Sequence, residues 1–67
     1  MMNIQVNGEL KQIANGCSIA DLLALLEITG RRIAVELNQE IVPKSLHTTT
    51  ILQENDCVEV VHAIGGG

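Results

Sequence analysis

One segment of the chain, SIADLLALLEITG at residues 18–30, has the pattern of a single amphipathic helix. Its apolar residues recur at i, i+3, i+4 and i+7 and so form one stripe: Ile19, Leu22, Leu23 and Leu26. Ser18 is a suitable N-cap, and Asp21 three residues later resembles the acid of a capping box. We therefore predict a helix over residues 18–29.

The end of this helix is also marked in the sequence. Gly30 stands where a glycine in the left-handed conformation would end the helix. Arg31 and Arg32 follow, where positive charge complements the helix dipole. The remaining segments are expected to form a sheet, and this one helix can cover only one of its faces.

The residues before the helix predict a β-hairpin. In IQV at residues 4–6, apolar and polar side chains alternate, and the Asn-Gly pair at 7–8 supplies the two positive φ angles of a type I′ turn. ELKQI at residues 9–13 returns as the second strand. Its apolar residues, Leu10 and Ile13, differ in parity, which a β-bulge or an early end of the strand would reconcile.

Two further strands follow the helix. RIAVELN at residues 32–38 alternates cleanly, as a half-buried strand does. The residues of its apolar face are Ile33, Val35 and Leu37. After a turn at 38–39, EIVP at residues 40–43 returns as a short strand. Pro43 donates no backbone hydrogen bond, so this strand is expected to lie at a sheet edge or to end there.

The last third of the chain leads to a final strand. KSLHTTTIL at residues 44–52 predicts a short helical turn and then a brief strand over 48–52. Asn55 and Asp56 mark a turn. CVEVVHAI at residues 57–64 is rich in β-branched residues and is apolar on both faces, which indicates a strand inside a sheet.

The predicted order is strand, strand, helix, strand, strand, strand. The right-handed crossover rule sets the third strand parallel to a member of the opening hairpin, with the helix between them. A mixed four- to five-stranded sheet packed on one helix is a β-grasp, the ubiquitin-like α+β architecture. We predict a β-grasp domain over residues 1–64 and a flexible C-terminal glycine tail at 65–67.

Composition limits the classes of function. With 67 residues, 46% of them hydrophobic and none aromatic, the chain can build one sheet on one helix but no deep enclosed pocket. The net charge of -4 and the lack of clustered Lys and Arg argue against nucleic-acid binding. No apolar run is long enough to span a membrane, and MMNIQVNGEL lacks the pattern of a signal peptide. We expect a cytoplasmic protein with no membrane contact, in which Cys17 and Cys57 are free thiols.

The sequence ends in VVHAIGGG. Three glycines extend about 10 Å from the domain and, without a Cβ, can enter a slot that is too narrow for other residues. The carboxylate of Gly67 is a poor electrophile until another enzyme activates it, most simply as an acyl-adenylate formed with ATP. The chain has no G-x-x-x-x-G-K-[ST] loop of its own for ATP. The alternative is an inert, frayed end.

Several segments, in this order, resemble the ThiS family, the sulfur carriers of thiamine biosynthesis. They are NG at 7–8, SIADLL at 18–23, AVELNQEIVP at 34–43 and ENDCVEVVHAIGGG at 54–67. The resemblance implies that a ThiF-type enzyme uses ATP to adenylate Gly67, that a sulfur donor system converts it to a thiocarboxylate, and that a ThiG-type thiazole synthase takes the sulfur. The protein would then be a co-substrate without bound cofactor, and not an enzyme.

The resemblance also assigns roles to the residues near the end of the chain. Gly65 and Gly66 would be the tail that threads the active sites of both partners. Apolar residues on an exposed sheet face would dock these partners, and we nominate three: Val61, Ala63 and Ile64.

Other reactive side chains do not form a recognisable site. Two cysteines and two histidines lack the spacing of a metal site, so none is predicted: Cys17, His47, Cys57 and His62. Neither cysteine has an evident base beside it, so we predict no catalytic residue. The acidic residues Glu54, Asp56 and Glu59 are interpreted as a solvated turn and strand face that could assist docking to a basic groove.

Three functions compete on the sequence alone. The first is a sulfur carrier with a C-terminal thiocarboxylate. The second is a carrier for another pathway, such as molybdopterin or cysteine synthesis, or a modifier conjugated to lysines. The third is a β-grasp interaction module with an inert tail.

Overall fold

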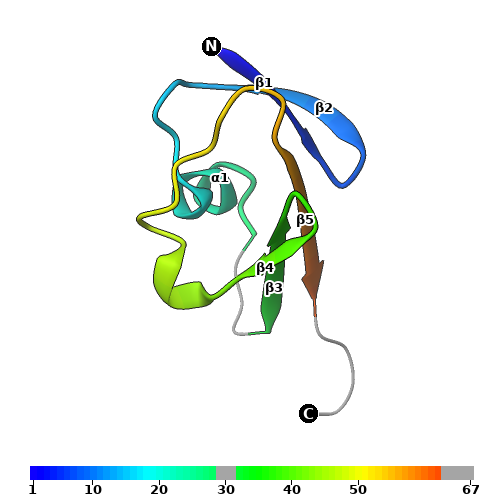
Figure 1. Ribbon diagram of the computed structural model, residues 1–67, viewed down its shortest axis with the longest axis vertical. Coiled ribbons are helices and arrows are strands. Elements are labelled where there is room, and N and C mark those ends of the chain that lie inside the picture. The colour runs from blue at the N-terminus through cyan, green and yellow to red at the C-terminus, as the bar shows by residue number, and fades with distance from the viewer. Residues whose placement is uncertain (29–31, 63–67) are drawn as a thin grey trace.

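The computed structural model describes residues 1–28 and 32–62, which form a five-stranded mixed sheet with one α-helix against one face (Figure 1). The order of strands across the sheet is β2-β1-β5-β3-β4. The elements are β1 (Met2–Val6), β2 (Glu9–Ile13), α1 (Ile19–Leu25), β3 (Ile33–Leu37), β4 (Glu40–Val42), the 3-10 turn η1 (Lys44–Leu46) and β5 (Cys57–His62). The predicted β-grasp arrangement is confirmed. The predicted boundary between domain and tail, at 64–65, lies outside the described residues.

The opening hairpin forms as predicted, with one correction. Asn7 and Gly8 have φ angles of 51° and 84°, as a type I′ turn requires. β2 pairs with β1 in an unbroken register from Val6↔Glu9 to Met2↔Ile13, so the expected bulge or early strand end is wrong. The two apolar residues of β2 differ in parity because Leu10 is exposed on the outer face while Ile13 is buried.

β5 lies inside the sheet, as its two-sided apolar pattern predicts. It runs parallel to β1 through the pairs Gln5↔Cys57 and Val6↔Val58. It runs antiparallel to β3 over five pairs, from Ile33↔His62 to Leu37↔Val58. Together with the antiparallel β1–β2 pair, these directions make β3 parallel to β2, as the crossover rule predicts.

The β3–β4 hairpin closes one edge of the sheet. Asn38 and Gln39 form its turn with φ angles of 51° and 71°. β4 is the edge strand and ends at Val42, just before Pro43, as predicted.

The predicted strand over residues 48–52 is wrong, although the helical turn before it is confirmed as η1. Of this segment, Ile51 alone forms a bridge, with Ser18. The backbone here serves the start of α1 instead, because Ile19 N donates to Thr50 O at 3.0 Å and Leu52 N donates to Cys17 O at 2.8 Å. These bonds secure the N-terminal end of the helix and leave no partner for a longer strand.

The core is aliphatic and lies between α1 and the sheet. Ile19 and Leu22 of the helix are fully buried, as is Val35 at the centre of β3. The remaining buried apolar residues come from β1, β2, β5 and the loop before β5: Met2, Ile4, Val6, Ile13, Leu52, Val58 and Val60. Every second residue of the central strands thus anchors the sheet to the helix.

Helix α1 begins as predicted. Asp21 N donates to Ser18 Oγ, and Ser18 N donates to Asp21 Oδ2, both at 3.1 Å, which completes a capping box. Ser18 is itself buried, so its hydroxyl has no ready alternative partner in solvent.

The helix ends earlier than the predicted residue 29. Glu27, with φ of 57°, takes the left-handed position that the sequence assigned to Gly30. Glu27 N donates to Ala24 O at 3.1 Å and Ile28 N to Leu23 O at 2.9 Å, which are the two bonds of a Schellman motif. Ile28 and Leu23 each pack on the core, and this burial offsets the cost of a positive φ at a residue other than glycine. The last helical turn holds no basic residue and ends well before Arg32, so the predicted role of Arg32 at the dipole is wrong, while Gly30 and Arg31 lie outside the described residues.

The capping box predicts a measurable contribution to stability. Ser18→Ala should lower the free energy of unfolding by about 1 kcal/mol, and the melting temperature by about 4–8 °C, because the part-buried N–H of Asp21 loses its acceptor. Urea and thermal denaturation followed by circular dichroism measure both quantities. Ser45→Ala, an identical change at an exposed position of η1, is the control and should be neutral. Equal effects of the two substitutions would contradict the assigned cap.

Candidate functional site

The candidate site begins where β5 leads towards the C-terminus. Val58 and Val60 fix the strand in the core, being 1% and 7% exposed. Val61 projects on the opposite face, is 54% exposed and pairs with Ala34 of β3. In Figure 1, β5 runs from beside the β1–β2 hairpin to the far end of the sheet. The other predicted site residues, Ala63, Ile64, Gly65, Gly66 and Gly67, lie outside the described residues.

Two turn asparagines hold β5 from its two sides. On the β1 side, Asn7 N donates to Val58 O at 2.9 Å, and Asn7 Oδ1 accepts from Val60 N at 2.8 Å. On the β3 side, Asn38 N donates to Cys57 O at 2.8 Å, and Asn38 Oδ1 accepts from Cys57 N at 3.0 Å. Both side chains extend the ladders beyond the last paired backbone residue. The sequence analysis assigned both asparagines to turns. It missed that their side-chain oxygens accept hydrogen bonds from β5, because these bonds join residues far apart in the sequence.

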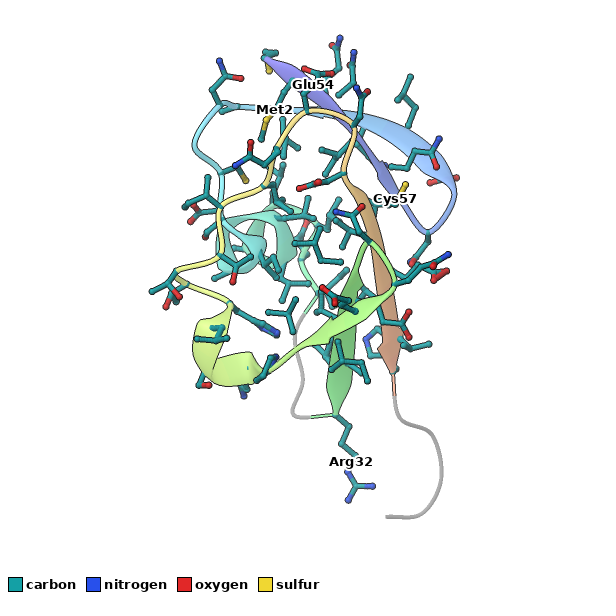
Figure 2. The ribbon with its side chains drawn as sticks, in the orientation of Figure 1. Met2, Arg32, Glu54 and Cys57 are labelled. Atoms are coloured by element: carbon teal, nitrogen blue, oxygen red, sulfur yellow. The ribbon has the colours of Figure 1, made fainter. Side chains whose placement is uncertain are left out.

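The loop before β5 uses two of the three predicted acidic residues for structure. Asp56 accepts from Gln53 N at 2.8 Å and from Asn38 Nδ2 at 3.0 Å. Glu54 Oε2 accepts from Asn3 N at 3.0 Å, and Figure 2 shows Glu54 over the start of β1, near Met2. Glu59 remains exposed on β5. Of the predicted acidic group, Glu59 is therefore the one whose carboxylate is not used inside the fold.

The sheet face turned away from α1 is open within the described residues. The register places the alternate residues of each strand on it: Gln5, Leu10, Ala34, Glu36, Ile41, Cys57, Glu59 and Val61. Leu10 and Ile41 are each 70% exposed. Exposed apolar side chains thus lie at both edges of the face, on β2 and β4, and at Val61 towards the end of β5, whereas the polar Gln5 lies beside the start of β5. Figure 2 shows Cys57 at that start and Arg32 at the opposite end of the sheet.

The cysteines and histidines are dispersed. Both cysteines are free thiols, Cys17 half-buried before α1 and Cys57 exposed on β5. Burial, and secondarily the carboxylate of Asp21, raise the pKa of the Cys17 thiol. His47 is buried with its Nε2 3.0 Å from Val42 O, and His62 ends β5. Within residues 1–28 and 32–62, no three His, Cys, Asp or Glu side chains gather as metal ligands would.

Comparison with known proteins identifies the family. The model of the ThiS family matches residues 4–67, which is nearly the whole chain and includes the three glycines. This chain belongs to the ThiS family. The match also shows that the GGG end is part of the family pattern rather than an addition to it.

Individual ThiS relatives agree with this assignment. The chain is 35% identical over 65 residues to the sulfur carrier protein ThiS of Bacillus subtilis, covering 96% of this chain and 98% of the relative. The crystal structure of a thiamine biosynthesis protein, ThiS, from Geobacter metallireducens superimposes with a TM-score of 0.87 at 30% identity, covering 98% of this chain and 100% of the other. Membership confirms the β-grasp fold and the prediction of a sulfur carrier rather than an enzyme.

A further relative is larger. The chain is 39% identical over 66 residues to a thiazole synthase of Magnetococcus marinus, covering 98% of this chain but only 20% of that protein. A ThiS-like stretch therefore forms about a fifth of a protein named as a thiazole synthase.

Among the described residues of the present chain, no helix is long and apolar enough to cross a membrane.

The support that Asn7 gives to β5 can be tested with two substitutions. Asn7→Asp keeps an acceptor for Val60 N, whereas Asn7→Gly keeps the positive φ and removes the acceptor. We expect Asn7→Gly to lower the free energy of unfolding by about 1–2 kcal/mol, because a part-buried N–H loses its partner. Asn7→Asp should remain close to the parent in urea denaturation. Equal stability of the Gly variant and the parent would contradict the role of this hydrogen bond.

The two thiols should differ in reactivity. Since the thiolate is the nucleophile, the raised pKa and partial burial of Cys17 should make its alkylation by iodoacetamide several-fold slower than that of Cys57 near neutral pH. The folded state also holds the Cys17 proton more tightly, so folding stability should fall as the pH rises above the ordinary thiol pKa of 9.0. Peptide mass spectrometry after timed labelling measures the rates. The difference should disappear in urea, and its absence in the native state would contradict the prediction.

Proposed function

We propose that this chain carries sulfur as a thiocarboxylate on Gly67 and delivers it for the thiazole ring of thiamine. The family match through residue 67 carries the proposal, because it joins the ThiS fold and the glycine end in a single pattern. The similarity to a ThiS sulfur carrier and to a ThiS protein of thiamine biosynthesis favours this pathway over molybdopterin or cysteine synthesis, lysine modification or an inert tail.

The chemistry requires two steps at the carboxyl group. The carboxylate of Gly67 attacks the α-phosphorus of ATP, which forms an acyl-adenylate and releases pyrophosphate. Sulfide released by the sulfur donor system then attacks the acyl carbon and displaces AMP, and loss of its proton leaves a thiocarboxylate. An adenylating enzyme of the ThiF type would bind the ATP, and a sulfur donor system would supply the sulfur. We place these steps in the cytoplasm.

The folded part of the chain contributes position rather than catalysis. Val58 and Val60 anchor β5 in the core, and Asn7 and Asn38 fix its two sides. A strand held in this way fixes Val61 and His62, the last described residues, relative to the open sheet face. Gly65 and Gly66 would then extend Gly67 into the active site of each partner, since glycine imposes no side chain.

The second partner would be a thiazole synthase of the ThiG type. This chain is similar to about a fifth of a protein named thiazole synthase. Because a ThiS-like segment and the remainder of that protein form one chain, the similarity supports a partnership between a carrier and a thiazole synthase. For docking we retain Val61, Ala63 and Ile64. The 54% exposure of Val61 on the open face supports its part in such a contact.

Loading of Gly67 can be measured directly. Incubation of the chain with ATP, a ThiF-type enzyme and a sulfur donor should replace one oxygen of the chain by one sulfur in the intact mass, with the change confined to the C-terminal peptide. One residue added after Gly67 should abolish the change, because the internal amide can no longer be adenylated.

The matched control adds the same residue before Met1, which is 81% exposed and leaves the carboxyl group of Gly67 chemically unchanged. This extended chain should be loaded at the rate of the parent. Absence of any mass change in the parent, under conditions in which a known ThiS protein is loaded, would overturn the proposed function.

A further inference from the structure

The open sheet face carries a pair of glutamates at directly opposed positions. Glu36 of β3 and Glu59 of β5 are Cα partners in the antiparallel register and project to the same side. Within residues 1–28 and 32–62 neither carboxylate has a recorded hydrogen bond or ion pair, whereas Lys11 pairs with Glu9 at 3.9 Å. Like charges directly opposite one another destabilise a sheet. The fold therefore gains nothing from this pair.

A shallow hollow adjoins the pair on the same face. It has a volume of about 260 Å³ and is lined by Gln5, Gly8, Gln39, Cys57, Val58 and Glu59. Small-molecule sites measure about 300–1,000 Å³, so the hollow is better matched to one protruding side chain. The Glu59 carboxylate and the Gln5 amide oxygen offer acceptors at its wall.

The apolar surroundings complete a small docking face. Val61 and Ala34 pair directly beside the glutamates towards the end of β5, and Ile41 is the Cα partner of Glu36 on β4. Because Ile41 is 70% and Val61 54% exposed, a partner that covers this face buries apolar area around two unpaired negative charges. Such burial is unfavourable unless a positive charge meets them.

We propose that this face, defined by Glu36, Glu59, Ile41 and Val61, docks the adenylating partner through one arginine side chain. The guanidinium lies between the two carboxylates and reaches into the hollow beside Cys57. Arginine fits better than lysine because its planar fork of donors can bond carboxylates on two neighbouring strands at once. The inference rests on the proposed function, which supplies the partner.

The charge of the whole molecule favours this partner over a second copy of the chain. A carrier of net charge -4 must bring its terminal carboxylate to the triphosphate of ATP, and like charges oppose this approach. A cationic contact on the body of the carrier offsets the repulsion. Two copies of this chain would bring two acidic faces together instead.

Charge-neutral substitutions test the docking face. Glu36→Gln and Glu59→Gln keep the shape of the side chain and its ability to form hydrogen bonds. Each should raise the Kd for a ThiF-type enzyme about tenfold, because a charged hydrogen bond is lost. Isothermal titration calorimetry over a series of salt concentrations measures Kd, and the double variant should show a shallower salt dependence. The KM for loading of Gly67 should rise with kcat unchanged.

Two readouts separate docking from folding and from the proposed function. Glu40→Gln removes the same charge from an exposed residue outside this face and should leave Kd within twofold of the parent. The urea midpoint of the Glu36→Gln/Glu59→Gln variant should equal or exceed that of the parent, because repulsion is removed. If the parent is loaded and both glutamine variants bind as tightly as Glu40→Gln, the docking proposal is overturned and the carrier function stands. If the parent is neither bound nor loaded, the docking proposal and the carrier function are both overturned. A dimer of this chain, found by sedimentation and abolished by substitutions on this face, would assign the face to self-association.

Discussion

Burial of β5 between β1 and β3 is the constraint on which the rest of this structure depends. Val58 and Val60 enter the aliphatic core at alternate positions, where Ile19 and Leu22 of the helix close the other side. The strand is parallel to β1 and antiparallel to β3, so the first and the last strands of the described chain lie side by side within the sheet. The last residues that the structure describes are therefore held by its most buried part.

The two asparagines show how a small fold secures that strand with few residues. Each lies in a tight turn with positive φ, and each offers its side-chain oxygen to an N–H of β5. The side chain thus replaces a backbone acceptor where the neighbouring strand has already turned away. A domain of this size buries a modest share of its surface, so such local bonds have a proportionally large effect on stability.

The position of helix α1 limits which face of the sheet a partner can reach. Within residues 1–28 and 32–62, the helix covers one face and leaves the other open, with exposed apolar residues and the opposed glutamates Glu36 and Glu59. A like-charged pair reduces the stability of a sheet, and its place on the uncovered face fits a role in contact with a partner. The same asymmetry separates the face that packs on the helix from the face that we propose for partner docking.

Much of this protein was predictable from local patterns. The alternation in residues 33–37, the Asn-Gly turn and the capping box at Ser18 are short-range features, because they depend on side chains within a few positions of one another. The glycine end, with its resemblance to the ThiS family, pointed to the carrier.

Tertiary structure decided what depends on distant partners. Helix α1 ends at Leu25, where Ile28 packs on the core and its N–H bonds to Leu23 O. Residues 48–52 form no strand because their backbone bonds to the start of the helix. The opposition of Glu36 and Glu59, 23 residues apart in sequence, likewise exists only once the sheet register is set.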